Sequence, residues 1–277
     1  MTDTLVESRP IEQRRVALRR TARRHRVTVL GVQVLVIAAV LVAWELLSGR
    51  VVQELLVSRP SDVFPTLWGW VTDGTLLQNA AVTFRTAGIG LLCGGVLGIL
   101  VGVVLGQAKT LAEIFEPMIT ALYTMPKHAL IPLFIMWVGI GSALGVVTAA
   151  VIVFFLVFFN TFFGIREVRP SLVNSVRIMG GSEIDVMLRV RLPSALIWVV
   201  AALKLAVPQA VVGVVVAEML AGDSGLGYLV ARNAGLFNSA GTFAALIVLL
   251  IAGFLIDRLM SWVTRKPLEW KNSNSAM

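Results

Sequence analysis

The sequence is poor in charged and chemically reactive side chains, and each shortage excludes a class of protein. Charged residues make up 14% of the 277 residues. An ordinary soluble domain carries about 25%, so this chain has too few polar side chains to cover a water-soluble surface. It has one cysteine, Cys93, so no disulfide can form within the chain. Its two histidines, His25 and His128, belong to no Cys/His cluster with metal-ligand spacing, and we expect no metal site.

The usual signatures of catalysis are also missing. The sequence has no G-x-S-x-G elbow and no Ser/His/Asp grouping, so we expect no catalytic residues and no enzyme activity of its own. It has no G-x-x-x-x-G-K-[ST] loop, and therefore cannot bind ATP in the P-loop manner. We expect no cofactor bound to this chain.

Long apolar runs are what the sequence has in abundance, with 57% hydrophobic residues overall. A run of about 18 or more apolar residues is typical of a membrane-spanning helix. Six segments qualify, at residues 27–48, 82–106, 114–137, 144–165, 194–220 and 241–263. We therefore predict an all-α membrane protein with six transmembrane helices in a lipid bilayer. A basic arm over 1–26 precedes a transmembrane domain over 27–265, and a tail over 266–277 follows it.

Lysine and arginine are distributed unevenly between the predicted loops. Six spans put both termini on one side, which would carry seventeen Lys and Arg residues against three on the other. The positive-inside rule then predicts cytoplasmic termini and a cytoplasmic 166–192 loop, in the plasma (inner) membrane. A basic arm can also bind nucleic acid. This one directly precedes a span, which favours an orientation signal, and we expect no nucleic-acid partner.

Small residues form a stripe along the second predicted span. Five glycines recur there at four-residue steps: Gly90, Gly94, Gly98, Gly102 and Gly106. Small residues at this spacing make a groove that a neighbouring helix can enter closely in lipid. We predict a tight helix–helix contact along this face.

Two lysines fall inside predicted spans. Lys127, beside His128, lies about thirteen residues into the third span and is flanked by prolines, which free backbone carbonyls. A lysine at this depth costs about 3 kcal/mol on insertion scales, so it should face a cavity or a partner. Lys204 repeats the pattern in the fifth span, where Pro208 predicts a kink.

Cations beside broken helices near the bilayer centre are typical of a solute path, here for an anionic or strongly polar solute. The alternative is an internal ion pair, with Glu218 as one possible partner for Lys204. Glu218, at the outer end of the fifth span, also fits an interface residue, and Arg85, in the first turn of the second span, can reach the interface. The candidate solute-path residues are Lys127, His128, Lys204, Glu218 and Arg85.

The segment between the fourth and fifth spans reads as a hairpin of two short amphipathic helices. Ser171 can cap a helix over 172–179, and Gly180–Gly181 would end it. Ser182 and Asp185 form a capping box for the second helix, and Pro193 would stop that helix before the fifth span. Such a hairpin can lie on lipid headgroups or dock its apolar face in a groove on a partner, and spacing alone leaves both open.

The hairpin carries a resemblance to a known family. Gly180, nine residues and then Val190-Arg191-Leu192-Pro193 match G-x9-I-x-L-P, the second half of the EAA loop of permease subunits of ATP-binding-cassette importers. The E-A-A positions read Asn174-Ser175-Val176 here, so the first half of the pattern is lost. The phrases SRPSDVFPTL, HALIPLFIMWVGIG and VVVAEMLAGDSGLGYL resemble the branch that handles nitrate, sulfonate, taurine and related solutes.

The resemblance implies a mechanism in which this chain is one of two permease subunits, usually a homodimer. Two ATPase subunits, which bind ATP and Mg, would each grip one hairpin, and an extracytoplasmic solute-binding protein would deliver the solute. The ATPase-coupling residues would be Val176, Arg177, Met179, Gly180, Gly181, Ser182, Ile184, Asp185, Met187, Leu188, Leu192 and Pro193. The alternative is an ion-coupled secondary transporter that works alone, with Lys127, Lys204 and Glu218 as coupling groups.

Overall fold

The computed structural model describes residues 8–264, with side chains described from residue 28 onward except at positions 109 and 111. Within that range the regular elements are helices, and the only β contact is an isolated bridge between Ser48 and Val52. The all-α prediction is therefore confirmed. The chain divides into two compact units, residues 1–62 and 63–277, which are described separately.

The N-terminal unit is dominated by one long helix, α1 (Ser8–Leu47). Its stretch Thr28–Leu47 is strongly apolar, and none of its hydropathic window is buried inside the protein. A helix that is apolar all round and uncovered by protein fits a lipid-facing span. The predicted arm and first span are thus one continuous helix from residue 8. Residues 1–7, and the predicted tail at 266–277, lie outside the described residues.

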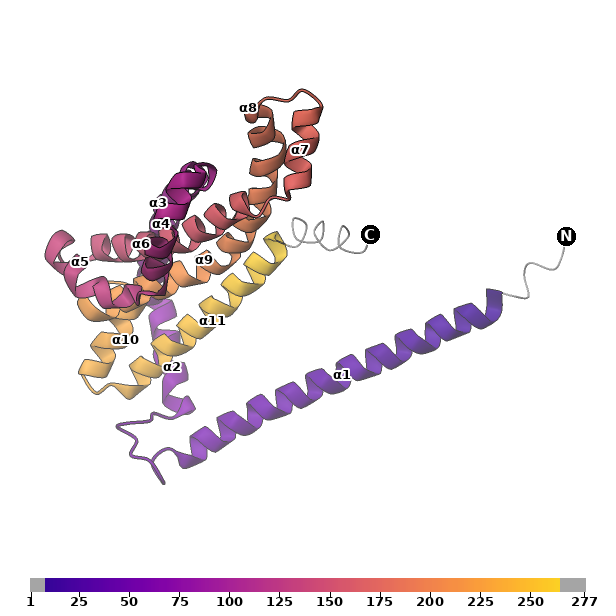
Figure 1. The fold of residues 1–277 in the computed structure, drawn as a ribbon. Helices are drawn as coiled ribbons and strands as arrows, with labels where there is room; N and C mark the ends of the chain where they lie inside the picture. Colours follow the sequence, from indigo (N-terminus) through magenta and orange to yellow (C-terminus); the bar gives the residue numbers. More distant parts are fainter. Residues whose placement is uncertain (1–7, 265–277) are drawn as a thin grey trace. The chain divides into compact units, whose positions relative to one another are not determined.

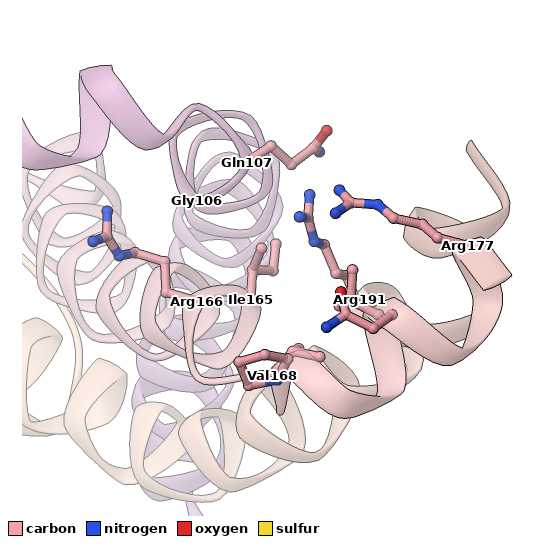
Figure 2. Close-up of a pocket in the computed structure, with 10 residues that line it drawn as sticks. Gly106, Gln107, Ile165, Arg166, Val168, Arg177 and Arg191 are labelled. Atoms are coloured by element: carbon pink, nitrogen blue, oxygen red, sulfur yellow. The ribbon is translucent and has the colours of Figure 1, made fainter. Parts of the chain in front are cut away.

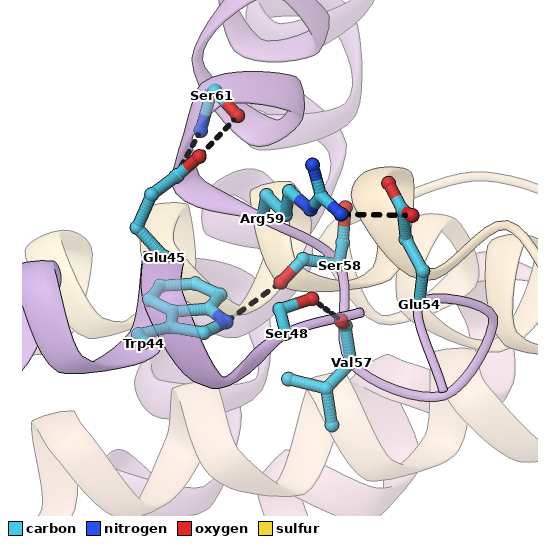
Figure 3. A network of polar contacts seen from close by, with 8 residues as sticks. All are labelled: Trp44, Glu45, Ser48, Glu54, Val57, Ser58, Arg59 and Ser61. Atoms are coloured by element: carbon cyan, nitrogen blue, oxygen red, sulfur yellow. Dashed lines mark hydrogen bonds and ion pairs between the residues drawn. The ribbon is translucent and has the colours of Figure 1, made fainter. Parts of the chain in front are cut away.

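The loop that follows α1 is tied back to the end of that helix by side-chain hydrogen bonds (Figure 3). The Trp44 indole Nε1 donates to the carbonyl oxygen of Ser58 at 2.7 Å. The Glu45 carboxylate accepts from the backbone N–H of Ser61 at 3.1 Å and from its hydroxyl at 2.8 Å. These bonds give hydrogen-bond partners to polar groups of Ser58 and Ser61, which would otherwise lack them at the end of a span.

The second unit is built around long apolar helices, which bear out the predicted spans. After α2 (Pro60–Thr72), four of them are long enough to cross a bilayer. They are α3 (Thr75–Gln107), α6 (Ser142–Arg166), α9 (Leu192–Ala221) and α11 (Ser239–Val263). Because α3 begins earlier than the apolar pattern predicts, Arg85 lies in its third turn rather than its first.

The glycine stripe of α3 packs directly on α6, as predicted. A Cβ built on Gly94 would lie 2.2 Å from the carbonyl oxygen of Ala150, and one on Gly98 would lie 2.9 Å from that of Phe154. The two backbones therefore approach so closely that no side chain fits between them. On its other side α6 packs against α9 through a buried core of small residues: Ala149, Val153, Val157, Ala202, Ala206, Ala210 and Val214, with Ala87 of α3.

The third predicted span is broken rather than continuous. It consists of α4 (Lys109–Thr124), a 3₁₀ turn (Lys127–Leu130) and α5 (Ile131–Val138). The apolar parts before and after the break, Ala112–Thr124 and Lys127–Val138, are bent by 84°. The break falls where Pro126 cannot donate a backbone hydrogen bond and Met125 adopts an extended conformation. With this bent pair counted as one, the described residues hold six spans.

The two ends of the second unit carry different short elements (Figure 1). One end carries a hairpin of α7 (Pro170–Ile178), α8 (Glu183–Val186) and a π turn (Met187–Arg191) that leads directly into α9. At the other end α9 turns into α10 (Leu226–Gly235), which packs against α9 and α11. The predicted hairpin is therefore present between the fourth and fifth spans.

Candidate functional site

Both intramembrane lysines line the same cavity, which has a volume of about 490 Å³. Lys127 and His128 reach it from the break after α4, and Lys204 reaches it from the middle of α9. The remaining lining residues come from α4, α6, α9 and α11, and are Tyr123, Ile152, Leu156, Leu205, Pro208, Gln209 and Asp257. The fold thus gathers three of the five predicted solute-path residues at one place.

The backbone break explains how Lys127 is held. Since α4 ends at Thr124, the carbonyl of Tyr123 is among those without an intrahelical partner. The ammonium of Lys127 donates a hydrogen bond to that carbonyl. It also lies 4.8 Å from the centroid of the Tyr123 ring and 5.7 Å from that of Phe155. The carbonyl and the two rings therefore hold the Lys127 ammonium at the break between α4 and the 3₁₀ turn.

Lys204 is held differently, because α9 continues through Pro208 without a break. The proline lacks an N–H, so the carbonyl of Lys204 loses its helical partner, but the helix does not end there. Among the described side chains Lys204 takes part in no ion pair. Asp257 of α11 lines the same cavity, so one carboxylate faces two lysines there.

Glu218 lies outside this cavity and is not the partner of Lys204. It is 7% exposed and lies three residues before the end of α9, so its carboxylate is covered by protein. Its carboxylate accepts from the Thr83 hydroxyl at 2.9 Å and from the backbone N–H of Gly227 at 2.9 Å. Arg85 is exposed on α3 and does not line the cavity either. Solute-path roles for Glu218 and Arg85 stay predictions that the geometry does not favour.

The Glu218 cluster caps the start of α10 with side chains from other helices. Leu226 N–H donates to the Thr83 hydroxyl at 2.8 Å, and Gly225 N–H donates to the side-chain oxygen of Asn79 at 2.8 Å. With the Gly227 bond, three N–H groups at this helix end are satisfied by α3 and α9. Asn79 and Thr83 were missed because Asn79 precedes the predicted apolar run at 82–106 and Thr83 is only its second residue. Their polar i, i+4 spacing was the only available signal.

The hairpin has the turn that the sequence predicts. Gly180 has a left-handed φ of +84°, Gly181 N–H bonds to the Val176 carbonyl at 2.9 Å, and α7 therefore ends in a glycine cap. The predicted capping box is also present, since Asp185 N–H bonds to the Ser182 hydroxyl at 3.2 Å and Ser182 N–H bonds to the Asp185 carboxylate at 3.0 Å.

Two details of the hairpin differ from the prediction. Ser171 does not cap α7, which begins at Pro170, two residues before the predicted start, with Arg169 as its N-cap. Pro193 does not stop the second helix. The π turn that precedes it, with its Leu192 N–H bonded to the Met187 carbonyl, changes the hydrogen-bond spacing, so helical backbone continues from α8 into α9.

The hairpin has its own small core and a separate exposed apolar surface. Val173, Val186 and Val190 are buried against one another, with Val168 and Val176 packed on them. The exposed apolar residues, here called the hairpin tip, are Leu172, Ile178, Met179, Ile184 and Leu188. Ile178 and Met179 are 87% and 86% exposed, which is unusual for residues of their type. Such a surface fits contact with another molecule.

Comparisons with known proteins agree with this architecture. The family described as binding-protein-dependent transport system inner membrane component matches residues 94–268. The putative aliphatic sulfonates transport permease protein SsuC of Bacillus subtilis is 30% identical over 237 residues, covering 85% of this chain and 86% of its own. The nitrate import permease protein NrtB of Synechococcus elongatus is 30% identical over 239 residues, covering 81% and 85%.

Among solved structures, a chain of the MetNI methionine ABC transporter in an inward-facing conformation matches with a TM-score of 0.61 at 21% identity. The match covers 73% of this chain and 98% of that chain. This likeness supports the overall fold.

Proposed function

This chain belongs to the family of inner-membrane components of binding-protein-dependent transport systems, and we propose that it forms the path of a small organic anion. The proposed solute carries a compact negative charge, as sulfonates, taurine and nitrate do. The energy comes from ATP hydrolysed on separate subunits, because this chain has no P-loop.

The observation that carries the solute class is the convergence of Lys127 and Lys204 on one cavity. Two ammonium groups in a low-dielectric surrounding attract an anion far more strongly than they would in water. The cavity volume of about 490 Å³ accommodates a small organic anion with part of its hydration shell. His128 and Gln209 add groups that can hydrogen-bond oxygen atoms of the solute.

The hairpin tip supports coupling to an ATPase subunit. Its exposed apolar residues come from α7, α8 and the π turn, in the segment between the ends of two spans. An amphipathic helix docks in a hydrophobic groove through such residues. Because the π turn continues into α9, movement of a docked hairpin is transmitted directly to the helix that carries Lys204.

The assembly that follows has two permease chains, two ATPase subunits and an extracytoplasmic binding protein. A second copy of this chain completes the path, and the hairpin and both termini face the cytoplasm, in keeping with the excess of Lys and Arg on that side. The hairpin and α10 stand at opposite ends of the second unit, so α10 is on the side where a binding protein delivers solute.

The solute path is tested by uptake of a radiolabelled sulfonate into vesicles that contain the assembled transporter. We expect Lys127→Gln and Lys204→Gln each to lower uptake about ten-fold or more, as the loss of roughly 1.4 kcal/mol of attraction would. Arg258→Gln is the matched control, since Arg258 is a cation of α11 that does not line the cavity. Unchanged uptake in both lysine variants would refute the path, and uptake without ATP would favour the ion-coupled alternative.

The coupling role is tested by co-purification of this chain with a P-loop ATPase subunit produced in the same cells. Ile184→Asp introduces a charge on the hairpin tip, where Ile184 is exposed, so folding is spared and docking is lost. Leu236→Asp is the control, because Leu236 is an equally exposed apolar residue at the end of α10. Full ATPase recovery with Ile184→Asp would contradict docking through the tip.

A further inference from the structure

A second cavity, of about 340 Å³, lies at the base of the hairpin (Figure 2). It is bounded by the ends of α3 and α6, by α7 and by the π turn. Its lining residues are Gly106, Gln107, Ile165, Arg166, Val168, Pro170, Val173, Asn174, Arg177 and Arg191. Three arginines and two amides thus line a cavity to which no carboxylate contributes.

Two of the three arginines point into this cavity. In Figure 2 the guanidinium groups of Arg177 and Arg191 face each other, with the Gln107 amide beside them. Arg166 points the other way, where it lies 3.7 Å from Glu116 and 5.5 Å from the ring of Phe162. The converging polar groups are therefore those of Gln107, Arg177 and Arg191.

The charge around these groups is balanced only in part within the described residues, because Arg177 has a carboxylate partner and Arg191 has none. Arg177 is paired with Glu183, at 2.6 Å from Nη2 and 2.9 Å from Nε to the same carboxylate oxygen. Arg191 takes part in no ion pair or hydrogen bond among the described side chains, whereas its neighbour Arg189 pairs with Asp185 at 3.1 Å. Two facing guanidinium groups repel each other unless an anion lies between them. The arrangement therefore favours a bound anion.

The position of the cavity indicates what kind of anion it takes. The spans α3 and α6 end at Gln107 and Arg166, which places the cavity at the membrane surface, where the phosphates of lipid headgroups lie. Guanidinium groups bind phosphate oxygens in a two-pronged geometry. The apolar walls of Ile165 and Val168 suit the glycerol and the first methylene groups of a lipid.

We propose that this cavity binds the phosphate group of an anionic phospholipid, held by Arg177, Arg191 and Gln107 at the base of the hairpin. The lipid phosphate bridges the end of α3 to α7 and the π turn. It therefore holds the hairpin at a defined orientation to the bundle. Basic pockets between helices at a membrane surface bind phosphate headgroups in this way. The site requires neither the solute nor an ATPase, so its test is independent of the transport function.

The test measures lipid binding to the purified full-length chain in mild detergent by native mass spectrometry. Phosphatidylglycerol is titrated against phosphatidylcholine and, in a separate arm, inorganic phosphate competes with each lipid. We expect saturable binding of phosphatidylglycerol that weakens at least ten-fold in Arg191→Gln and less in Arg191→Lys, which keeps the charge but loses the fork. Arg189→Gln is the matched control. Arg189 carries the same charge as Arg191 and lies two residues before it, but its side chain is exposed and does not line the cavity.

The lipid titrations and the inorganic phosphate competition distinguish a lipid phosphate from free phosphate as the ligand. Binding of phosphatidylglycerol that depends on Arg191 but not on Arg189 supports the proposal. Saturable binding of inorganic phosphate, with no lipid dependence, retains the phosphate site but overturns the lipid as its ligand. Equal lipid binding by wild type and Arg191→Gln, with both folded by circular dichroism, overturns the proposal altogether. An Arg177→Gln variant, compared in the same way, reports on the second guanidinium.

Discussion

Replacing Gly94 by alanine should separate the two central helices of the second unit. The added Cβ would lie 2.2 Å from the carbonyl oxygen of Ala150 and 3.0 Å from its Cα. Ordinary contacts of a Cβ begin at 3.4 Å, so the α3 and α6 backbones would have to part by about 1 Å. The neighbour is backbone, which cannot rotate away as a flexible side chain can.

The expected cost follows from these distances. Overpacking of this kind typically costs about 1–3 kcal/mol. Alanine regains about 1 kcal/mol of helix propensity over glycine, so the net loss is up to about 2 kcal/mol. Gly88→Ala is the matched control in the same helix, because nothing lies within 4 Å of its added Cβ, and it should stabilise α3 slightly.

The assay is the free energy of unfolding of the purified chain in detergent, obtained by titration with a denaturing detergent and followed by tryptophan fluorescence. Gly94→Ala should unfold earlier than wild type, and Gly88→Ala at the same point or later. If the two variants proved equally stable, the close approach of α3 to α6 would not limit stability, and the reasoning would fail.

Substitutions at Ser182, Gly180 and Thr83 test the groups that cap the ends of α7, α8 and α10. Ser182→Ala removes the capping box and should raise hydrogen exchange over 182–191 by an amount corresponding to about 1 kcal/mol, without affecting the bundle. Gly180→Ala should cost about 1–2 kcal/mol in the hairpin because of its left-handed φ, although space is free around it, and Gly180→Asn should cost less. Thr83→Val leaves the Leu226 N–H and the Glu218 carboxylate short of a partner and should destabilise α10 by about 1–3 kcal/mol. The control Thr72→Val, at an exposed hydroxyl bonded only within its own helix, should have little effect on thermal stability.

Local signals in the sequence predict local structure well in this protein. The capping box at Ser182 and the glycine cap at Gly180 depend on residues within a few positions of each other, and both are present. The start of α7 was misjudged because Pro170 competes with Ser171 for the first turn. The continuation through Pro193 was missed because a π turn changes the carbonyl that the proline would meet, and the apolar pattern carries no mark of it.

The candidate site was predictable only in part. An intramembrane lysine is costly wherever it lies, so Lys127 and Lys204 could be singled out without knowledge of the fold. That they share a cavity, and that Asp257 of α11 faces it, depends on contacts between helices far apart in the chain. The link between Glu218 and Thr83 has the same origin, since no short-range pattern reports which hydroxyl a buried carboxylate will meet.

The glycine stripe has a mechanical consequence for the whole unit. Atoms of α6 lie directly against the glycines that recur along α3. If one helix slid along the other, backbone carbonyl oxygens of α6 would collide with Cα atoms of α3 at several places at once. The helices α3 and α6 are therefore expected to move together as one rigid body. Any rearrangement that opens or closes the bundle must therefore occur elsewhere, and the 84° bend beside Lys127 is one place where the backbone is not held by such a contact.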